Sequence, residues 1–424
     1  MAKKKEEKPK REMTKRHLSL WEQQKKRRRI ALVVGITVIA AVLGIVVAGW
    51  YINQYKPLHQ KVIKVNDTEF NMDYYIKTLK IYAAGMSSSY LPFWAEQVVA
   101  IIETDELVKQ EAAKLGITVS DEAVDEELKS SDPPLNNDYR DLVGADLLRE
   151  KLLAEYFDPQ VPVSDEERYV MAMFLESAGQ AAEVKARLEA GEDFAELAEE
   201  LSLESTSKEK KGDFGWRPKD ALAALLGTSL LDEYAFGAGV GEISQPIYDE
   251  SGSKQVGYWL AKISERKEDT GEIHVHAMLL GSAEEAQSVK ARIEAGEDFA
   301  ELAVELSQYE TSKSNRGDLG LLPEDMIPAI DEFVRGPELE LEKLSEPIRD
   351  DTMVTTGGYW LVKVTDIEEN RTIEEENRDL LKAKLLDEWM ASLSENPKNT
   401  IDHSYLTDDL KMRAMQKAVE VTSD

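Results

Sequence analysis

The longest hydrophobic stretch of the chain is residues 30–52, which contain no charged side chain. A helix of this length, rising about 1.5 Å per residue, crosses a hydrocarbon core about 30 Å thick. Five basic residues, 25–29, directly precede the run, and basic flanks stay on the cytoplasmic side of a membrane. The pattern predicts a basic cytoplasmic tail at 1–29, a transmembrane helix at 30–52 in the lipid bilayer and an extracytoplasmic remainder. A cleaved signal peptide is the alternative, but the run is long and no clear A-x-A site follows.

Helical spacing of hydrophobic residues dominates both ends of the remainder. Residues 57–160 are predicted to form a helical module that opens with a short strand at Val62–Val65 and a turn at Asn66-Asp67. Residues 371–424 are predicted to be polar and helical. An apolar stripe in this last segment should pack on the N-terminal module, and consists of Leu380, Leu381, Leu385, Leu386 and Trp389.

An internal repeat occupies the middle of the chain. Residues 184–202 and 289–307 match at 17 of 19 positions, at an offset of 105 residues. The likeness extends to two alternating segments, Gly257-Tyr-Trp and Gly358-Tyr-Trp. Each unit spans too many residues for a solenoid repeat, so the pattern indicates a duplicated globular domain.

Each repeat has the same predicted order of elements. An apolar strand precedes two amphipathic helices, a glycine turn and a short helical stretch, and an alternating strand closes the unit. The predicted domains are residues 164–266 and 272–367, each a small α+β domain closed by its own Gly-Tyr-Trp strand.

Charge and composition exclude several functions. The net charge is −30, whereas residues 1–29 carry 13 basic and 4 acidic side chains, a local charge of +9. Nucleic-acid binding needs a basic footprint and is not expected for so acidic a body. The chain has no cysteine and five histidines. His274 and His276 share one face of a strand, but no third ligand is evident nearby, so we expect no metal site and no cofactor.

The repeats resemble parvulin domains of the peptidyl-prolyl isomerase family. The resemblance rests on V-K-A-R-[LI]-E-A-G-E-D-F-A-E-L-A, then G-D-[FL]-G, [IL]-S-x-P and G-Y-W-L-x-K-[VI] in each repeat. The helical module, with I-K-V-N-D at Ile63–Asp67, is similar to that of SurA-like and PrsA-like folding factors. The resemblance implies an α+β fold: a SurA-like helical module, two tandem parvulin-like domains and one N-terminal transmembrane helix.

The resemblance also assigns candidate catalytic positions. They fall at Met171 or Ala172, Glu204 and Trp259 in repeat one, and at His276 or Ala277, Tyr309 and Trp360 in repeat two. Active parvulins carry a histidine on the first strand, and His276-Ala-Met-Leu resembles that motif. A strict count from the helix reaches Ala277, so His276 requires one extra loop residue; we favour His276. The second family histidine is replaced by tryptophan in both repeats.

The apolar wall that binds peptide in this family is expected at Leu226, Leu231, Phe236, Met326, Ile330 and Phe333. The resemblance implies a membrane-anchored extracytoplasmic folding factor whose partners are unfolded exported polypeptides. Three functions stay open: an isomerase of X-Pro bonds, a catalytically silent holdase and a scaffold at the secretion site. The sequence indicates no oligomeric state.

Overall fold

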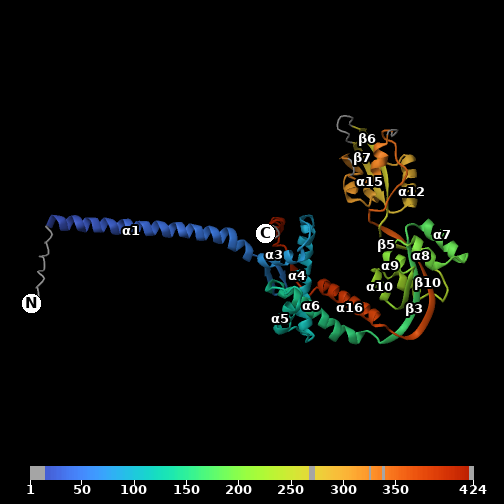
Figure 1. The fold of residues 1–424 in the computed structure, drawn as a ribbon, viewed down its shortest axis with the longest axis horizontal. Coiled ribbons are helices and arrows are strands. Elements are labelled where there is room, and N and C mark those ends of the chain that lie inside the picture. The colour runs from blue at the N-terminus through green and yellow to red at the C-terminus, as the bar shows by residue number, and fades with distance from the viewer. Residues whose placement is uncertain (1–14, 267–272, 324–325, 337–339, 420–424) are drawn as a thin grey trace, which may run out of the picture. The chain divides into compact units, whose positions relative to one another are not determined.

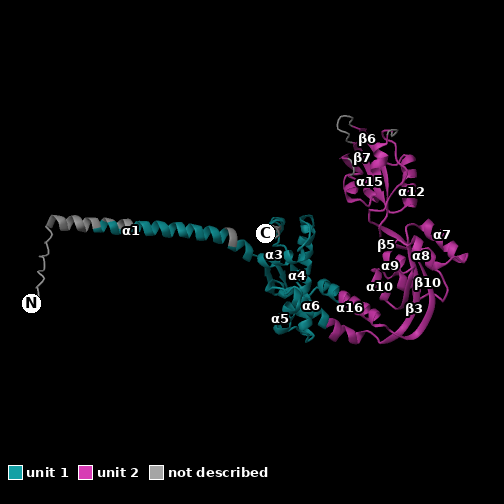
Figure 2. Cartoon of the chain, in the orientation of Figure 1, with its two compact units in different colours: residues 1–151, 389–424 teal, residues 152–388 magenta. Residues whose placement is uncertain are grey.

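A computed structural model describes residues 15–266, 273–323, 326–336 and 340–419 (Figure 1). The chain forms two compact units, residues 1–151 with 389–424 (unit 1) and residues 152–388 (unit 2), which Figure 2 distinguishes by colour. Each unit is described separately below.

The hydrophobic run lies in helix α1 (Lys15–Trp50). Its stretch Leu32–Trp50 has a mean hydropathy of 2.8, and its side chains are not buried against protein, so length and composition suit a membrane span. A π turn, η1 (Tyr51–Tyr55), and α2 (Lys56–His59) follow. Of the predicted basic tail, residues 15–29 belong to α1 and residues 1–14 lie outside the described part of the chain.

The part of unit 1 that follows α2 is largely helical, but its first segment ends at residue 151, so residues 152–160 of the module predicted at 57–160 belong to unit 2. Strands β1 (Lys61–Val65) and β2 (Thr68–Asn71) form a hairpin, and Asn66 has the left-handed φ of 53° that its turn requires. The helices that follow are α3 (Met72–Tyr82), η2 (Ser88–Tyr90), α4 (Leu91–Lys114), α5 (Asp121–Ser130), η3 (Asn137–Tyr139) and α6 (Arg140–Leu152).

The C-terminal segment returns to this module, but not through the whole range predicted. Helix α16 (Glu375–Glu395) begins in unit 2, where Arg378 pairs with Asp158 at 2.8 Å. Strand β11 (Ile401–Asp402) pairs with β1, and α17 (Asp408–Val419) packs on α3 and α4. Residues 371–388, which hold most of the predicted stripe, therefore belong to unit 2 and not to the N-terminal module.

Unit 2 contains two four-stranded antiparallel sheets, in the orders β4-β3-β10-β5 and β8-β7-β6-β9. Unit 2 begins with η4 (Leu153–Phe157) and η5 (Asp158–Gln160). Lobe 1 comprises β3 (Ser164–Leu175), α7 (Ala178–Glu189), α8 (Phe194–Leu201), α9 (Ser205–Glu209), β4 (Asp213–Pro218), α10 (Ala221–Leu226), α11 (Leu230–Ala235), β5 (Ile247–Lys254) and β10 (Thr355–Thr372). Lobe 2 comprises β6 (Gly257–Arg266), β7 (Ile273–Leu280), α12 (Ala283–Glu294), α13 (Phe299–Leu306), α14 (Glu310–Ser314), β8 (Asp318–Leu322), α15 (Pro328–Arg335) and β9 (Ile348–Asp350).

The two lobes exchange their closing strands. The Gly-Tyr-Trp strand after repeat one, β6, pairs with β7 of lobe 2, where Trp259 lies opposite Leu279. The strand after repeat two, β10, runs beside β3 of lobe 1 (Figure 1), where Trp360 lies opposite Phe174. Lobe 1 is therefore residues 164–254 with 355–372, and lobe 2 is residues 257–350, in place of the predicted tandem ranges 164–266 and 272–367.

The short connection between β5 and β6 gives a physical reason for this exchange. Gln255 and Val256 alone join the two strands. A two-residue hairpin favours Gly or Asn, which tolerate left-handed φ, and a β-branched valine does not. The chain instead continues directly into the other sheet, where β6 pairs with β7. This pairing is possible because β6 and β10 have nearly the same sequence.

Helices cover both faces of each sheet. In lobe 1, Val170, Ala172 and Phe174 face α10 and α11, whereas Met173 and Leu175 face α7 and α8. Lobe 2 repeats this arrangement, with Val275, Ala277 and Leu279 facing α15 and the alternate residues facing α12 and α13. Because neighbouring strand residues point to opposite faces, each candidate position is assigned to one face.

Candidate functional site

In each lobe, an alanine of the first strand of the repeat lies on the sheet face that also carries the predicted apolar wall. Ala172 and Ala277 are buried in the clusters that contain Leu231 and Ile330, respectively. Helices α7 and α12 begin at the same offset of 105 residues as the two alanines, so the repeats contain no relative loop insertion. His276 lies on the opposite face, with Met278 and Leu280, because strand residues alternate. His276, which the sequence favoured, therefore does not lie on the face of the predicted wall, whereas the alternative Ala277 does.

The second family position holds a fully buried tryptophan in each lobe. Trp259 is 0% exposed and donates its indole N–H to Oδ2 of Asp350 at 3.0 Å. Trp360 is 2% exposed and donates to Oδ2 of Asp249, also at 3.0 Å. Both tryptophans belong to the lobe cores and their single N–H donors are already used.

The two aspartates that accept hydrogen bonds from these tryptophans were not identified from the sequence. Asp249 and Asp350 each stand three residues after a proline, in Pro-Ile-Tyr-Asp and Pro-Ile-Arg-Asp, and this repetition was the available signal. Burial of Asp350 opposes ionisation, but hydrogen bonds from Thr352 and Trp259 outweigh it and lower the pKa of its carboxyl. Asp350 is therefore an ionised acceptor that holds the indole in place.

The predicted peptide-binding wall is divided between core and surface. Leu231 and Ile330 are 0% and 1% exposed, so neither offers its side chain to a peptide in this conformation. Leu226, Phe236 and Phe333 pack partly buried against the same cores. Met326 is the exception, since 58% of it is exposed.

The remaining two candidate catalytic residues, Glu204 and Tyr309, contact other parts of their own lobes. The Glu204 carboxylate caps α9 by accepting from the N–H groups of Thr206 and Ser207. Tyr309 packs edge-on against Trp259, with ring centroids 5.2 Å apart.

One buried acid lies behind the lobe 1 wall. Asp232, 2% exposed, accepts hydrogen bonds from the backbone N–H groups of Asp220 and Ala223. Burial raises the pKa of its carboxyl to about 6. Its contacts fix the start of α10, so its role is structural.

Unit 1 exposes a group of large apolar side chains that we call the aromatic patch: Met86, Tyr90, Phe93 and Trp94. The first three are 48%, 59% and 56% exposed. Trp94 donates its N–H to the Met86 sulfur at 2.8 Å and stacks with its ring centroid 5.8 Å from that of Tyr82. Aromatic contacts and a flexible thioether suit binding to varied apolar segments.

A cavity of about 440 Å³ lies between α4, α5 and α6 of the same unit. Its lining combines apolar residues such as Phe70 and Leu148 with the Asp105–Arg149 ion pair. Burial raises the pKa of Asp105 to about 6, although Arg149 opposes the shift.

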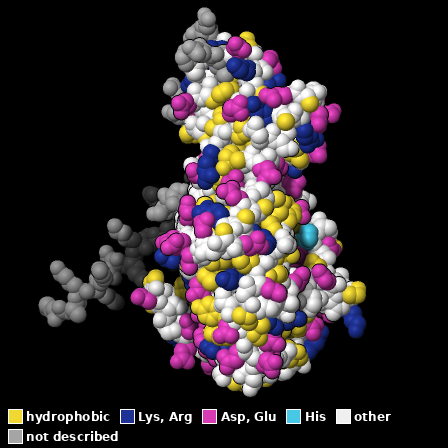
Figure 3. All heavy atoms as spheres, turned by 90° about the vertical axis from the view of Figure 1, so that its right-hand side faces the viewer, with side chains coloured by type: hydrophobic (Ala, Val, Ile, Leu, Met, Phe, Trp, Pro, Cys, Tyr) yellow, Lys and Arg dark blue, Asp and Glu magenta, His cyan; other side chains and the backbone are white. Residues whose placement is uncertain are grey.

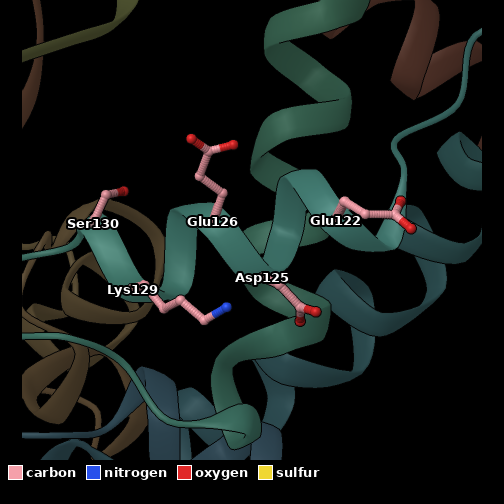
Figure 4. A pocket seen from close by; sticks show the side chains of 5 residues that line it. All are labelled: Glu122, Asp125, Glu126, Lys129 and Ser130. Carbon is pink, nitrogen blue, oxygen red and sulfur yellow. The ribbon is translucent and has the colours of Figure 1, made fainter.

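A second hollow, shown in Figure 4, is formed by side chains of α5 alone. The carboxylates of Glu122, Asp125 and Glu126 point in different directions, and Asp125 is paired with Arg140. These side chains do not converge on a common point and form no site.

The domain matches follow the two sequence repeats. Models of the PPIC-type PPIASE domain match residues 175–265 and 258–368, so the two matches overlap on β6. The foldase protein PrsA of Caldanaerobacter subterraneus subsp. tengcongensis is 32% identical over 190 residues, which are 41% of this chain and 58% of the relative. The chaperone SurA of Hahella chejuensis is 24% identical over 292 residues, which are 65% of this chain and 63% of that protein.

The chain thus spans less than two thirds of the length of these curated relatives. A solved structure of the peptidylprolyl isomerase PrsA from Bacillus anthracis aligns with 76% of this chain and 95% of its own, at 13% identity and a TM-score of 0.31. The domain matches and the curated relatives agree with the repeated motifs. Residues 175–265 and 258–368 therefore match two PPIC-type PPIASE domains, and the chain resembles the parvulin-type PrsA and SurA proteins.

Proposed function

We propose that this protein is a membrane-anchored extracytoplasmic holdase, which binds unfolded exported polypeptides without isomerising X-Pro bonds. The proposal rests on which residues occupy the two positions where active parvulins carry histidine. One is alanine and the other is a buried tryptophan whose N–H is bonded to aspartate, in both lobes.

The chemistry of isomerisation explains why this observation weighs against catalysis. Rotation about a peptide bond has a barrier of about 18–20 kcal/mol, because twisting the amide sacrifices resonance. An isomerase lowers the barrier by binding the twisted amide more tightly than the planar one, partly through placed hydrogen bonds. Alanine has no side-chain donor or acceptor, and the indole donors are occupied. The wall that would face the substrate is largely lobe core.

The aromatic patch supports the holding function. Exposed contiguous apolar surface on a soluble unit commonly marks an interaction site. Acidic side chains are spread over the molecular face in Figure 3, with hydrophobic ones exposed between them, so the body stays soluble while apolar segments can bind. The names of the relatives, foldase and chaperone, agree with this role.

Localisation follows from the first helix. Leu32–Trp50 is long and apolar enough to span a bilayer, and the basic run at 25–29 precedes it. On this basis we propose that unit 2 and the part of unit 1 that follows α1 lie outside the cytoplasmic membrane, where exported chains emerge unfolded.

An aggregation-suppression assay tests the holding function. A patch variant replaces three exposed residues: Met86→Ser, Tyr90→Ser and Phe93→Ser. We expect the full-length variant to require several-fold more protein than the wild type to keep a denatured client soluble. Light scattering during dilution of the client from denaturant measures this.

A matched control distinguishes the patch from general surface hydrophobicity. It replaces three residues of unit 2 that are at least 58% exposed: Val163→Ser, Val240→Ser and Val354→Ser. The control should suppress aggregation as the wild type does. Equal losses in both variants, or none in the patch variant, would contradict the assignment of the patch.

A further inference from the structure

Two imidazoles and one carboxylate converge at the edge of the lobe 2 sheet. His274 and His276 lie on β7 and Asp318 is the first residue of β8, and their potential ligand atoms all lie within 4.8 Å of one another. The two rings stack with centroids 5.1 Å apart, and Nε2 of His274 lies 2.7 Å from Oδ1 of Asp318.

The strand geometry explains the convergence. Residues two apart on a strand share a face, so both imidazoles point the same way. Asp318 pairs with His276 across a register shift between β7 and β8, which brings its carboxylate beside the two rings. Its Oδ1 also accepts from the Gly320 N–H at 2.8 Å, which fixes the aspartate in its turn.

Lobe 1 shows how much of this arrangement the fold itself requires. At the matching positions it has Tyr169, Met171 and Asp213. The Tyr169 hydroxyl donates to Asp213 at 2.8 Å, and Asp213 accepts from the Gly215 N–H as Asp318 does from Gly320. One donor beside the aspartate therefore satisfies the turn. The second imidazole of lobe 2 goes beyond that structural requirement.

We propose that His274, His276 and Asp318 bind a divalent first-row transition cation, for which Zn²⁺ is the appropriate probe. Imidazole nitrogens with one carboxylate suit such ions better than Mg²⁺ or Ca²⁺, which prefer all-oxygen shells. Bonds of about 2 Å would draw the three ligand atoms to roughly 3.3 Å from one another, with water completing a tetrahedron. The side chains of His274 and Asp318 are 29% and 46% exposed, so solvent and ions have access.

The charges around the site permit a cation. Lys262, which lies opposite His276 on β6, is paired with Glu342 at 2.6 Å. The hydroxyl of Ser264 lies 3.1 Å from Nε2 of His276 and can orient that ring. A bound ion would tie the edge strand β8 to β7.

Zinc titration of the full-length protein in detergent, after treatment with a chelator, tests the site. The variant His274→Tyr with His276→Met copies lobe 1, so the Tyr–Asp hydrogen bond should preserve the turn. We expect the wild type to bind one Zn²⁺ more than the variant, or to bind it at least about tenfold more tightly. Identical stoichiometry and affinity in two folded proteins would overturn the proposal.

Thermal unfolding provides a second readout. Zn²⁺ should raise the melting temperature of the wild type and not that of the variant, because an ion bound by the native state alone stabilises it. Mg²⁺ should have no such effect on either protein. An equal zinc-induced increase in both proteins, or an equal increase with Mg²⁺, would overturn the assignment.

Discussion

The buried indole–carboxylate pairs turn the family's catalytic positions into parts of each lobe's core. Trp259 with Asp350 and Trp360 with Asp249 have the same geometry in the two lobes. An indole N–H in a core needs an acceptor, because leaving it unsatisfied costs the desolvation of that group. The pairs therefore stabilise the fold with groups that a catalyst would keep free for its substrate.

Removal of one acceptor should destabilise unit 2. Asp350→Ala leaves the Trp259 N–H without its partner, and we expect a loss of about 1–3 kcal/mol in the free energy of unfolding. Urea denaturation measures it. In the Trp259→Phe background the same substitution should cost less, so a double-mutant cycle isolates the pair. Additive losses would show that the hydrogen bond does not contribute.

Asp232 should make stability depend on pH. Its pKa is raised to about 6 from an ordinary value of 3.8, so the folded state holds the proton more tightly than the unfolded chain. The stabilisation is present at low pH and is lost as pH rises through about 6, by at most about 3 kcal/mol. Asp232→Asn should flatten this dependence between pH 5 and 7 in urea unfolding. The same slope in both proteins would contradict the assignment.

Individual contacts were the least predictable part of the site. The sequence placed His274 and His276 on one strand face correctly, but Asp318 lies 42 residues beyond His276 and reaches them only through the β7–β8 register. Likewise, the tryptophans were identified from the closing-strand motif, whereas their aspartate partners come from a different strand. Pairing between strands is tertiary information that local patterns do not carry.

At the scale of elements, the exchange means that lobe 1 requires β10 and lobe 2 requires β6 to complete its sheet. Lobe 2 is inserted between β5 and β10 of lobe 1, where Lys254 and Thr355 are paired directly. The repeated sequence predicted the opening strand, the helix pair and the closing strand of each repeat, because helix caps and strand alternation are local signals. It did not predict the strands β4, β5, β8 and β9, of which β4 and β8 begin within the predicted glycine turns. It did not predict which sheet receives each closing strand, since Gly-Tyr-Trp-Leu occurs in both.

Excision of lobe 2 tests this nesting. Replacing residues 255–354 with Asn-Gly joins β5 to β10 by a favourable two-residue hairpin. We expect the shortened protein to retain a cooperative unfolding transition for lobe 1, followed by circular dichroism in urea. The separate fragment 255–352 should also fold.

The tandem fragment 164–266 is the matched comparison. It contains β6 in place of β10, and in the exchanged arrangement it lacks its native closing strand. We expect it to be less stable than the Asn-Gly protein. A fragment 164–266 that unfolds cooperatively at the same urea concentration would favour unexchanged lobes.

At the scale of the whole molecule, the proposal of a tethered binding protein rests on the apolar helix, the acidic body and the exposed aromatic patch. The apolar helix and the charge asymmetry were predictable from the sequence, because both depend on composition along the chain. The patch was not predicted, because the exposure of Tyr90 and Phe93 depends on tertiary packing.

Holding without isomerisation is tested most directly by refolding a client whose slow phase is limited by X-Pro isomerisation. The full-length protein in detergent should leave that rate at its uncatalysed value while it suppresses aggregation of the same client in a parallel assay. A refolding rate that rises in proportion to the concentration of this protein would contradict the proposal and identify an active isomerase.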